Sequence, residues 1–66
     1  MNPKDIGDRL RIARGVFRSQ AEVAEAVGVG PSAISQYERG ERIPTDEIKI
    51  ALANYYGMTV QELFYT

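Results

Sequence analysis

The twenty residues from position 20 to position 39 constrain the fold more than any other part of the chain. They predict two short helices joined by a turn at residues 28–30, because Gly28 suits the left-handed position at a helix end and Pro31 suits a first helical turn. Small or apolar residues, among them Ala24 and Val27, fall where the two helices must touch. The second helix keeps a polar outer face. A closely packed pair of helices is therefore the central expectation.

Length and composition limit what can be built around this pair. The chain has 66 residues, which is enough for a single domain spanning residues 1–66. It contains no cysteine and no histidine, and this excludes disulfides, zinc sites built on cysteine, and acid–base catalysis by histidine. We expect no metal, no cofactor and no enzymatic activity.

Charge and hydropathy indicate the setting of the chain. No apolar run approaches the roughly 20 residues that a membrane helix needs, and the first residues are charged and lack the apolar core of a signal peptide. We therefore expect a cytoplasmic protein. The net charge is −1; residues 1–44 carry seven basic against six acidic side chains and residues 45–66 carry one against three. Any basic surface has to be assembled by folding.

Helix ends are marked in the first part of the chain. Asn2 and Pro3 suit the cap and first turn of a helix, and the pattern Ser19-x-x-Glu22 is a capping box that starts the first helix of the central pair. The apolar stripe predicted for the N-terminal helix consists of Ile6, Leu10, Ala13 and Phe17.

Two more helices follow the central pair. Thr45 is a suitable cap for the fourth helix and Gly57 ends it, while Thr59 and Glu62 form a second capping box before a short fifth helix that ends near Phe64. No segment alternates like a strand. Short connections between five helices predict a compact all-α bundle.

Four fragments of this pattern, in this order and at these spacings, resemble a known family. They are RLRIAR in the first helix, SQAEVAEAVGV in the second, SAISQYERGERIP across the third, and LANYYGMTVQELF at the end. Together they are similar to the DNA-binding domains of phage repressors of the lambda type and of Cro. The resemblance covers residues 6–64 and implies a five-helix lambda-repressor-like domain in which helices 2 and 3 form a helix-turn-helix. Lambda-type repressors place the third helix in the major groove of operator DNA.

The resemblance assigns DNA contacts to polar residues on and around the third helix. Gln36 suits the edge of adenine, because its amide can make two hydrogen bonds there, and Ser32 and Ser35 lie near it on the same face. Gln20, at the start of the second helix, is expected to bind a phosphate. Contacts to the DNA backbone are also expected from Arg18, Arg39 and Arg42. For Gln20 and the polar residues of the third helix the alternative is an ordinary solvated side chain, and for Arg39 and Arg42 it is a favourable interaction with the C-terminal end of that helix.

Other residues receive supporting roles. The resemblance implies an ion pair between Arg14 on the first helix and Glu38 on the third, which braces the reading helix. We expect a homodimer on a palindromic double-stranded operator, with its interface on the crowded apolar tail formed by Leu63, Phe64 and Tyr65. Glu22 and Glu25 are expected to be solvated, with RNA polymerase as an alternative partner.

Two functions remain open on the sequence alone. The first is a sequence-specific regulator of transcription, most simply a repressor that occludes a promoter. The alternative is a protein-interaction module that has kept the fold without binding DNA. The acidic pI of about 5.3 favours the second function, whereas the polar third helix and the arginines near it favour the first.

Overall fold

The structure is a computed structural model that describes residues 2–65. Over that range it contains five helices and no strand, so the expected all-α class is confirmed. None of the helices in residues 2–65 is long and apolar enough to cross a membrane. The helices are α1 (Pro3–Arg14), α2 (Gln20–Val27), α3 (Pro31–Glu38), α4 (Asp46–Tyr56) and α5 (Val60–Phe64).

The predicted helix caps are present. The Asn2 side chain accepts a hydrogen bond from the Asp5 amide at 2.8 Å, and the capping boxes of α2 and α5 are complete in both directions. Gly28 ends α2 with φ of 81° and donates to the Ala24 carbonyl at 2.9 Å. Because an L side chain is strained at such a φ, glycine is what allows the chain to turn from α2 into α3.

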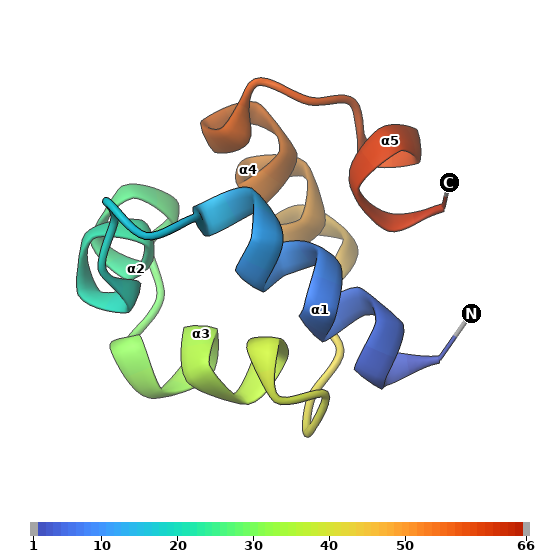
Figure 1. Ribbon diagram of the computed structural model, residues 1–66. Helices are drawn as coiled ribbons and strands as arrows, with labels where there is room; N and C mark the ends of the chain where they lie inside the picture. The colour runs from blue at the N-terminus through green and yellow to red at the C-terminus, as the bar shows by residue number, and fades with distance from the viewer. Residues whose placement is uncertain (1, 66) are drawn as a thin grey trace.

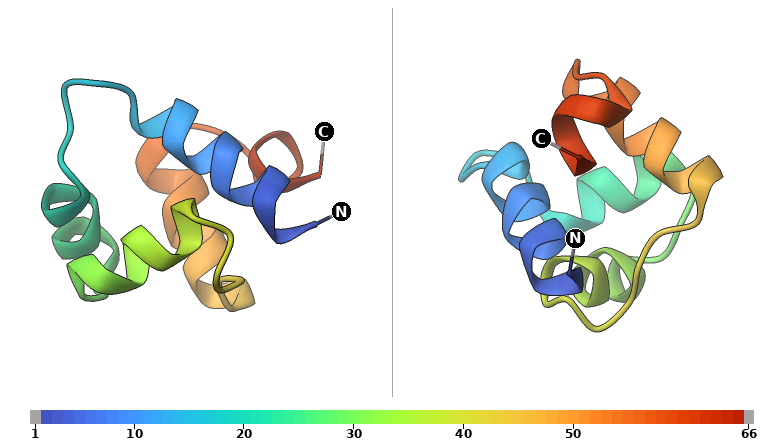
Figure 2. Two further views of the ribbon diagram at one scale, coloured as in Figure 1. Left: turned by 60° about the horizontal axis from the view of Figure 1, so that its bottom comes forward. Right: turned by 90° about the vertical axis from the view of Figure 1, so that its right-hand side faces the viewer.

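The five helices enclose one core (Figure 1). Helix α1 packs against α3 and α5, α2 packs against α3 and α4, and α4 packs against α5. The two further views show α3 along one side of the molecule, with its long outer face uncovered by any other helix (Figure 2). The largest side chains that are fully buried are Phe64, Ile34, Leu52, Leu63 and Val23.

Helices α1 and α3 approach each other closely at Gly7. A Cβ atom at this position would lie 2.4 Å from the carbonyl oxygen of Glu38 and 2.7 Å from that of Tyr37. Both obstacles belong to the backbone of α3 and cannot swing aside. The absence of a side chain at Gly7 therefore sets the distance between α1 and the last turn of α3.

The apolar stripe predicted for the first helix is wrong at its end. Helix α1 ends at Arg14, and Gly15, with φ of 70°, turns the chain away. Phe17 is 95% exposed, and its neighbour Val16 is 91% exposed. Ile6 and Leu10 lie in the core as expected, and Ala13 packs against it. The helical spacing of apolar residues extends to Phe17 in the sequence, although the helix itself ends at Arg14.

This correction has a measurable consequence. We expect Phe17→Ser to leave the free energy of unfolding within about 0.5 kcal/mol of the parent, because substitutions at exposed positions rarely exceed that value. Phe64→Ala is the matched control, since Phe64 is fully buried and truncating a core phenylalanine costs about 3–5 kcal/mol. Urea denaturation of both variants measures the difference; a loss above about 2 kcal/mol in Phe17→Ser would contradict the exposed position.

The predicted dimer surface on the tail is also wrong for two of its three residues. Leu63 is 1% exposed and Phe64 is fully buried in the single chain, so both belong to the core and have no surface to offer a partner. Tyr65 alone is exposed, and its hydroxyl lies 3.1 Å from the Lys49 ammonium of α4. Three consecutive large apolar residues looked like a patch, but the fold buries two of them.

Candidate nucleic-acid interface

The outer face of α3 carries the residues expected to read DNA. Ser32 is exposed, and Ser35 and Gln36 are half-buried. Within residues 2–65, neither the Ser32 hydroxyl nor the Gln36 side-chain amide makes a hydrogen bond to another group of the protein. Both groups are therefore available to a partner outside it. One turn separates Ser32 from Gln36, which places them on the same face of the helix.

Arg39 and Ser35 are joined at the C-terminal end of this face. The Arg39 guanidinium donates to the Ser35 hydroxyl and, through Nε and Nη2, to the two carboxylate oxygens of Glu41 at 2.8 and 3.1 Å. Hydrogen bonding to Glu41 raises the pKa of Arg39, and the same contact lowers the pKa of the Glu41 carboxyl. The cation expected to meet a phosphate already holds a carboxylate.

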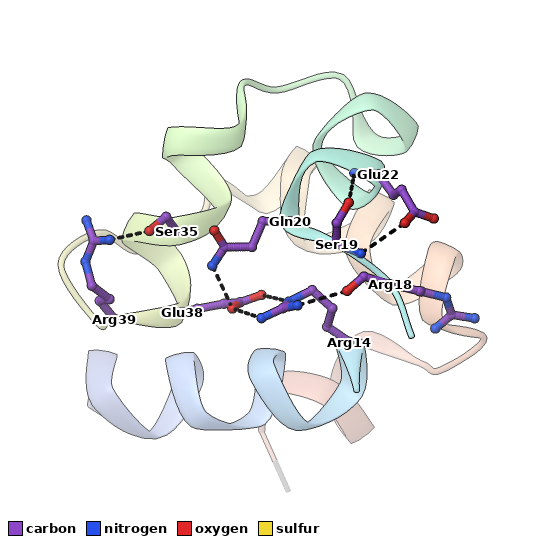
Figure 3. Close-up of polar contacts among 8 residues, drawn as sticks. All are labelled: Arg14, Arg18, Ser19, Gln20, Glu22, Ser35, Glu38 and Arg39. Carbon is purple, nitrogen blue, oxygen red and sulfur yellow. Dashed lines mark hydrogen bonds and ion pairs between the residues drawn. The ribbon is translucent and has the colours of Figure 1, made fainter. Parts of the chain in front are cut away.

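The ion pair expected between Arg14 and Glu38 is present and is the most enclosed polar contact of the site (Figure 3). Arg14 donates from Nε to Glu38 Oε2 at 2.7 Å and from Nη2 to Oε1 at 2.9 Å. The Glu38 side chain is 4% exposed and that of Arg14 is 18% exposed. The hydrogen bond with Glu38 raises the pKa of Arg14, against the opposing effect of burial.

This pair links three elements. Arg14 on α1 also donates from Nη1 to the Arg18 carbonyl at 2.9 Å, in the turn before α2. The Gln20 amide, at the start of α2, donates to Glu38 Oε1 at 3.1 Å. Glu38 on α3 thus lies between Arg14 and Gln20 (Figure 3). Of the two amide hydrogens of Gln20, one is used inside the protein and one remains for an outside acceptor.

Tyr56, at the end of α4, is close enough to this network to respond to it. Burial raises the pKa of its phenol to about 12, and the nearby Glu38 carboxylate adds to that shift. A phenol in this position stays neutral at any physiological pH. Half-buried Tyr56 therefore adds no charge of its own to the surroundings of the Arg14–Glu38 pair.

Of the two remaining arginines expected to contact DNA, Arg42 lies beside α3 and Arg18 does not. The Arg42 guanidinium lies 5.6 Å from the centre of the Tyr37 ring, just beyond α3. Arg18 lies 5.3 Å from the centre of the Tyr55 ring, and its side chain points away from α3 (Figure 3). Arg42 thus belongs to the surface around α3, whereas Arg18 is directed to the end of α4.

Two residues of this region were missed by the sequence reasoning. Glu41 was counted only as a charge, and nothing in its spacing indicated a pairing with Arg39 two residues earlier. Gly7 was not singled out, although a glycine in the middle of an otherwise good helix is a recognised sign of close packing. Both depend on how α3 ends and on what lies behind it.

Comparison with known proteins agrees with this geometry. The family model described as Helix-turn-helix matches residues 18–63, which include α2, the turn and α3. This chain belongs to the helix-turn-helix family. Helices α2 and α3 and the turn between them are the helix-turn-helix itself.

Individual relatives place the domain among the phage-repressor type. The cryptic phage CTXphi transcriptional repressor RstR of Vibrio cholerae is 39% identical over 54 residues, covering 82% of this chain and 47% of that protein. The chain therefore spans about half the length of this curated relative. The P22 c2 repressor, solved in complex with a synthetic operator, is 34% identical over 91% of this chain and 92% of that chain, with a TM-score of 0.85.

A second kind of regulator shares the fold equally well. The restriction-modification controller protein C.AhdI from Aeromonas hydrophila has a TM-score of 0.87 and is 30% identical, over 94% of this chain and 96% of that chain. The five-helix lambda-repressor-like fold expected from the sequence is therefore confirmed.

Proposed function

We propose that this chain binds double-stranded DNA as a sequence-specific transcriptional regulator, most simply a repressor, with α3 in the major groove. The observation that carries the proposal is the open outer face of α3, on which Ser32 and Gln36 keep their hydrogen-bonding groups free of partners among residues 2–65. A solved relative of the same fold, 34% identical, is a repressor in complex with operator DNA. Helices of this kind read base edges in the major groove.

Backbone contacts complete the proposed interface. Gln20 offers its second amide hydrogen to a phosphate near the positive end of α2. Arg39 and Arg42 follow the C-terminal end of α3 and would contact phosphates there. Phosphate contacts of this type fix the register of a protein on the duplex but carry no sequence information. We assign Arg18 a weaker part, because its guanidinium faces Tyr55 and Tyr56.

Dimerisation on a palindromic operator remains part of the proposal, with a changed surface. Of the tail residues first considered only Tyr65 is exposed, and the neighbouring helix α4 adds the exposed Ile50. Lys49 joins the tail to α4, since its ammonium bonds to the Tyr65 hydroxyl at 3.1 Å.

A contact with RNA polymerase is a separate part of the proposal. Glu25 is the better candidate for it, because Glu22 is held in the capping box of α2.

Selection of bound duplexes from a random pool tests this function. We expect enrichment of one motif whose two halves are related by a two-fold axis and have centres about 34 Å apart, the distance of one helical turn of DNA. Absence of any enriched motif, together with binding that does not change with salt, would instead favour the protein-interaction module. Enrichment of a single half-site would retain DNA reading and reject the dimer.

Gln36 gives the sharpest residue-level prediction. We expect Gln36→Ala to weaken binding to the selected site by about 1–3 kcal/mol and to leave binding to random duplex unchanged, because a base contact contributes only where the correct base is present. Fluorescence anisotropy with both duplexes measures the two affinities. Equal losses on both duplexes would show that Gln36 contacts the backbone or supports the fold instead.

A further inference from the structure

The pairing of Arg39 with Glu41 has a consequence beyond the proposed DNA binding, on which it rests. Both side chains are more than half exposed, at 56% and 55%. Three of the guanidinium nitrogens of Arg39 donate within the chain: Nε and Nη2 to Glu41, and Nη1 to the Ser35 hydroxyl. The cation at the end of α3 is thus occupied by groups of the protein itself.

The geometry of this contact is the one that a phosphate would use. A guanidinium presents the Nε and Nη2 hydrogens as a planar fork, and a carboxylate or a phosphate binds that fork through two parallel hydrogen bonds. Glu41 fills this fork with bonds of 2.8 and 3.1 Å. A DNA phosphate therefore has to displace the Glu41 carboxylate before Arg39 can hold it in the same way.

The negative charge of Glu41 also weakens binding to the DNA backbone. Its carboxylate lies three residues beyond the end of α3, on the side where Arg39 would meet the negatively charged backbone. Non-specific binding to DNA comes almost entirely from phosphate contacts by cations. A chain with a net charge of −1 has few cations to spare, so the occupation of one of them matters.

We propose that Glu41 competes with DNA phosphates for Arg39 and thereby lowers the affinity of the domain for DNA. On any duplex, a phosphate gains the Arg39 fork only at the cost of the pair with Glu41. On a random site, where no base contacts fix the position of the domain, Arg39 stays paired and one phosphate contact is lost. Glu41 thus tunes how tightly the domain holds DNA without touching a base.

The test compares Glu41→Gln with Glu47→Gln in the full chain. Glu47 is an exposed acid in the first turn of α4, so both variants remove one negative charge, but only the first releases Arg39. Random-sequence duplex is the probe, and its dissociation constant is measured by anisotropy over a series of salt concentrations. The exposed pair contributes little to folding, so both variants are expected to fold, which circular dichroism checks.

We expect Glu41→Gln to bind random duplex about three- to tenfold more tightly than the parent near 0.1 M salt, with the slope of log affinity against log salt steeper by about 0.9, as for one added phosphate contact. The gain on the selected site should be at least as large, because the variant has no pair to break before a phosphate reaches Arg39. In an Arg39→Gln background, Glu41→Gln should gain no more than Glu47→Gln does.

The outcomes separate this inference from the proposed function. If the parent binds duplex in a salt-dependent way but Glu41→Gln behaves as Glu47→Gln does, the restraint is overturned and the function stands. A gain that persists without Arg39 also overturns it, because the effect is then one of net charge. If neither the parent nor any variant binds duplex, the proposed function fails and the restraint fails with it.

Discussion

Glu38→Ala is expected to destabilise the domain by about 3 kcal/mol. The substitution leaves the mostly buried Arg14 guanidinium without its carboxylate and removes the acceptor of the Gln20 amide. Breaking a buried ion pair from one side costs about 3–5 kcal/mol, because an uncompensated charge stays in the interior. We place the loss at the lower end, since Arg14 keeps its bond to the Arg18 carbonyl and reaches solvent in part.

Two controls show whether burial is the reason. Asp8→Ala breaks the contacts of Asp8 with Lys4 and Arg11, which are exposed on α1, and we expect a loss below about 1 kcal/mol there. The double variant Arg14→Met, Glu38→Met removes both charges and should recover most of the stability lost in Glu38→Ala. Denaturant unfolding at neutral pH gives all three values; a loss in Glu38→Ala no larger than that in Asp8→Ala would contradict the buried brace.

Gly7→Ala is expected to cost about 3 kcal/mol, although alanine is the better helix former by about 1 kcal/mol. The new methyl group would meet two carbonyl oxygens of α3 at 2.4 and 2.7 Å. Helix α1 has to move away from α3 to accommodate it, and the Arg14–Glu38 pair spans the same two helices. Domains of this length have total stabilities of about 3–10 kcal/mol, so the variant should be partly unfolded at 37 °C.

A matched glycine isolates the steric cause. Gly30 precedes α3 with φ of −79°, and a Cβ there would meet no atom within 4 Å. Gly30→Ala should therefore lose at most about 1 kcal/mol, mainly through the weaker preference of alanine for a helix cap. Thermal unfolding followed by circular dichroism compares the two variants, and equal midpoints would disprove the close approach at Gly7.

The sequence predicted those features of the fold that depend on residues close together in the chain. Caps such as Asn2 and the two capping boxes mark helix starts through bonds within four residues, so no tertiary information was needed to find them. The distribution of the last apolar residues was different. Successive helical residues point about 100° apart, so Leu63, Phe64 and Tyr65 cannot all face one way, and only the packing of α1 and α4 decides which of them is covered.

The candidate site divides in the same manner. The polar face of α3 follows from the 3.6-residue period, so Ser32 and Gln36 were found from spacing alone. The Arg14–Glu38 pair was expected from the family resemblance, because no periodicity connects two residues 24 positions apart. The Arg39–Glu41 pair was missed, since it depends on the backbone turn after α3, where Gly40 adopts φ of 73°.

The contact between α1 and α5 has a consequence for how the chain matures during synthesis. Ile6 and Leu10 lie in one core with Leu63 and Phe64, so the first helix cannot complete the burial of its apolar stripe until the fifth has emerged from the ribosome. Nascent chains that have not reached this point display unburied apolar side chains, the state in which aggregation and chaperone capture compete with folding. Ribosomal pausing before the fifth helix has emerged is thus expected to lengthen the interval in which the nascent chain can aggregate.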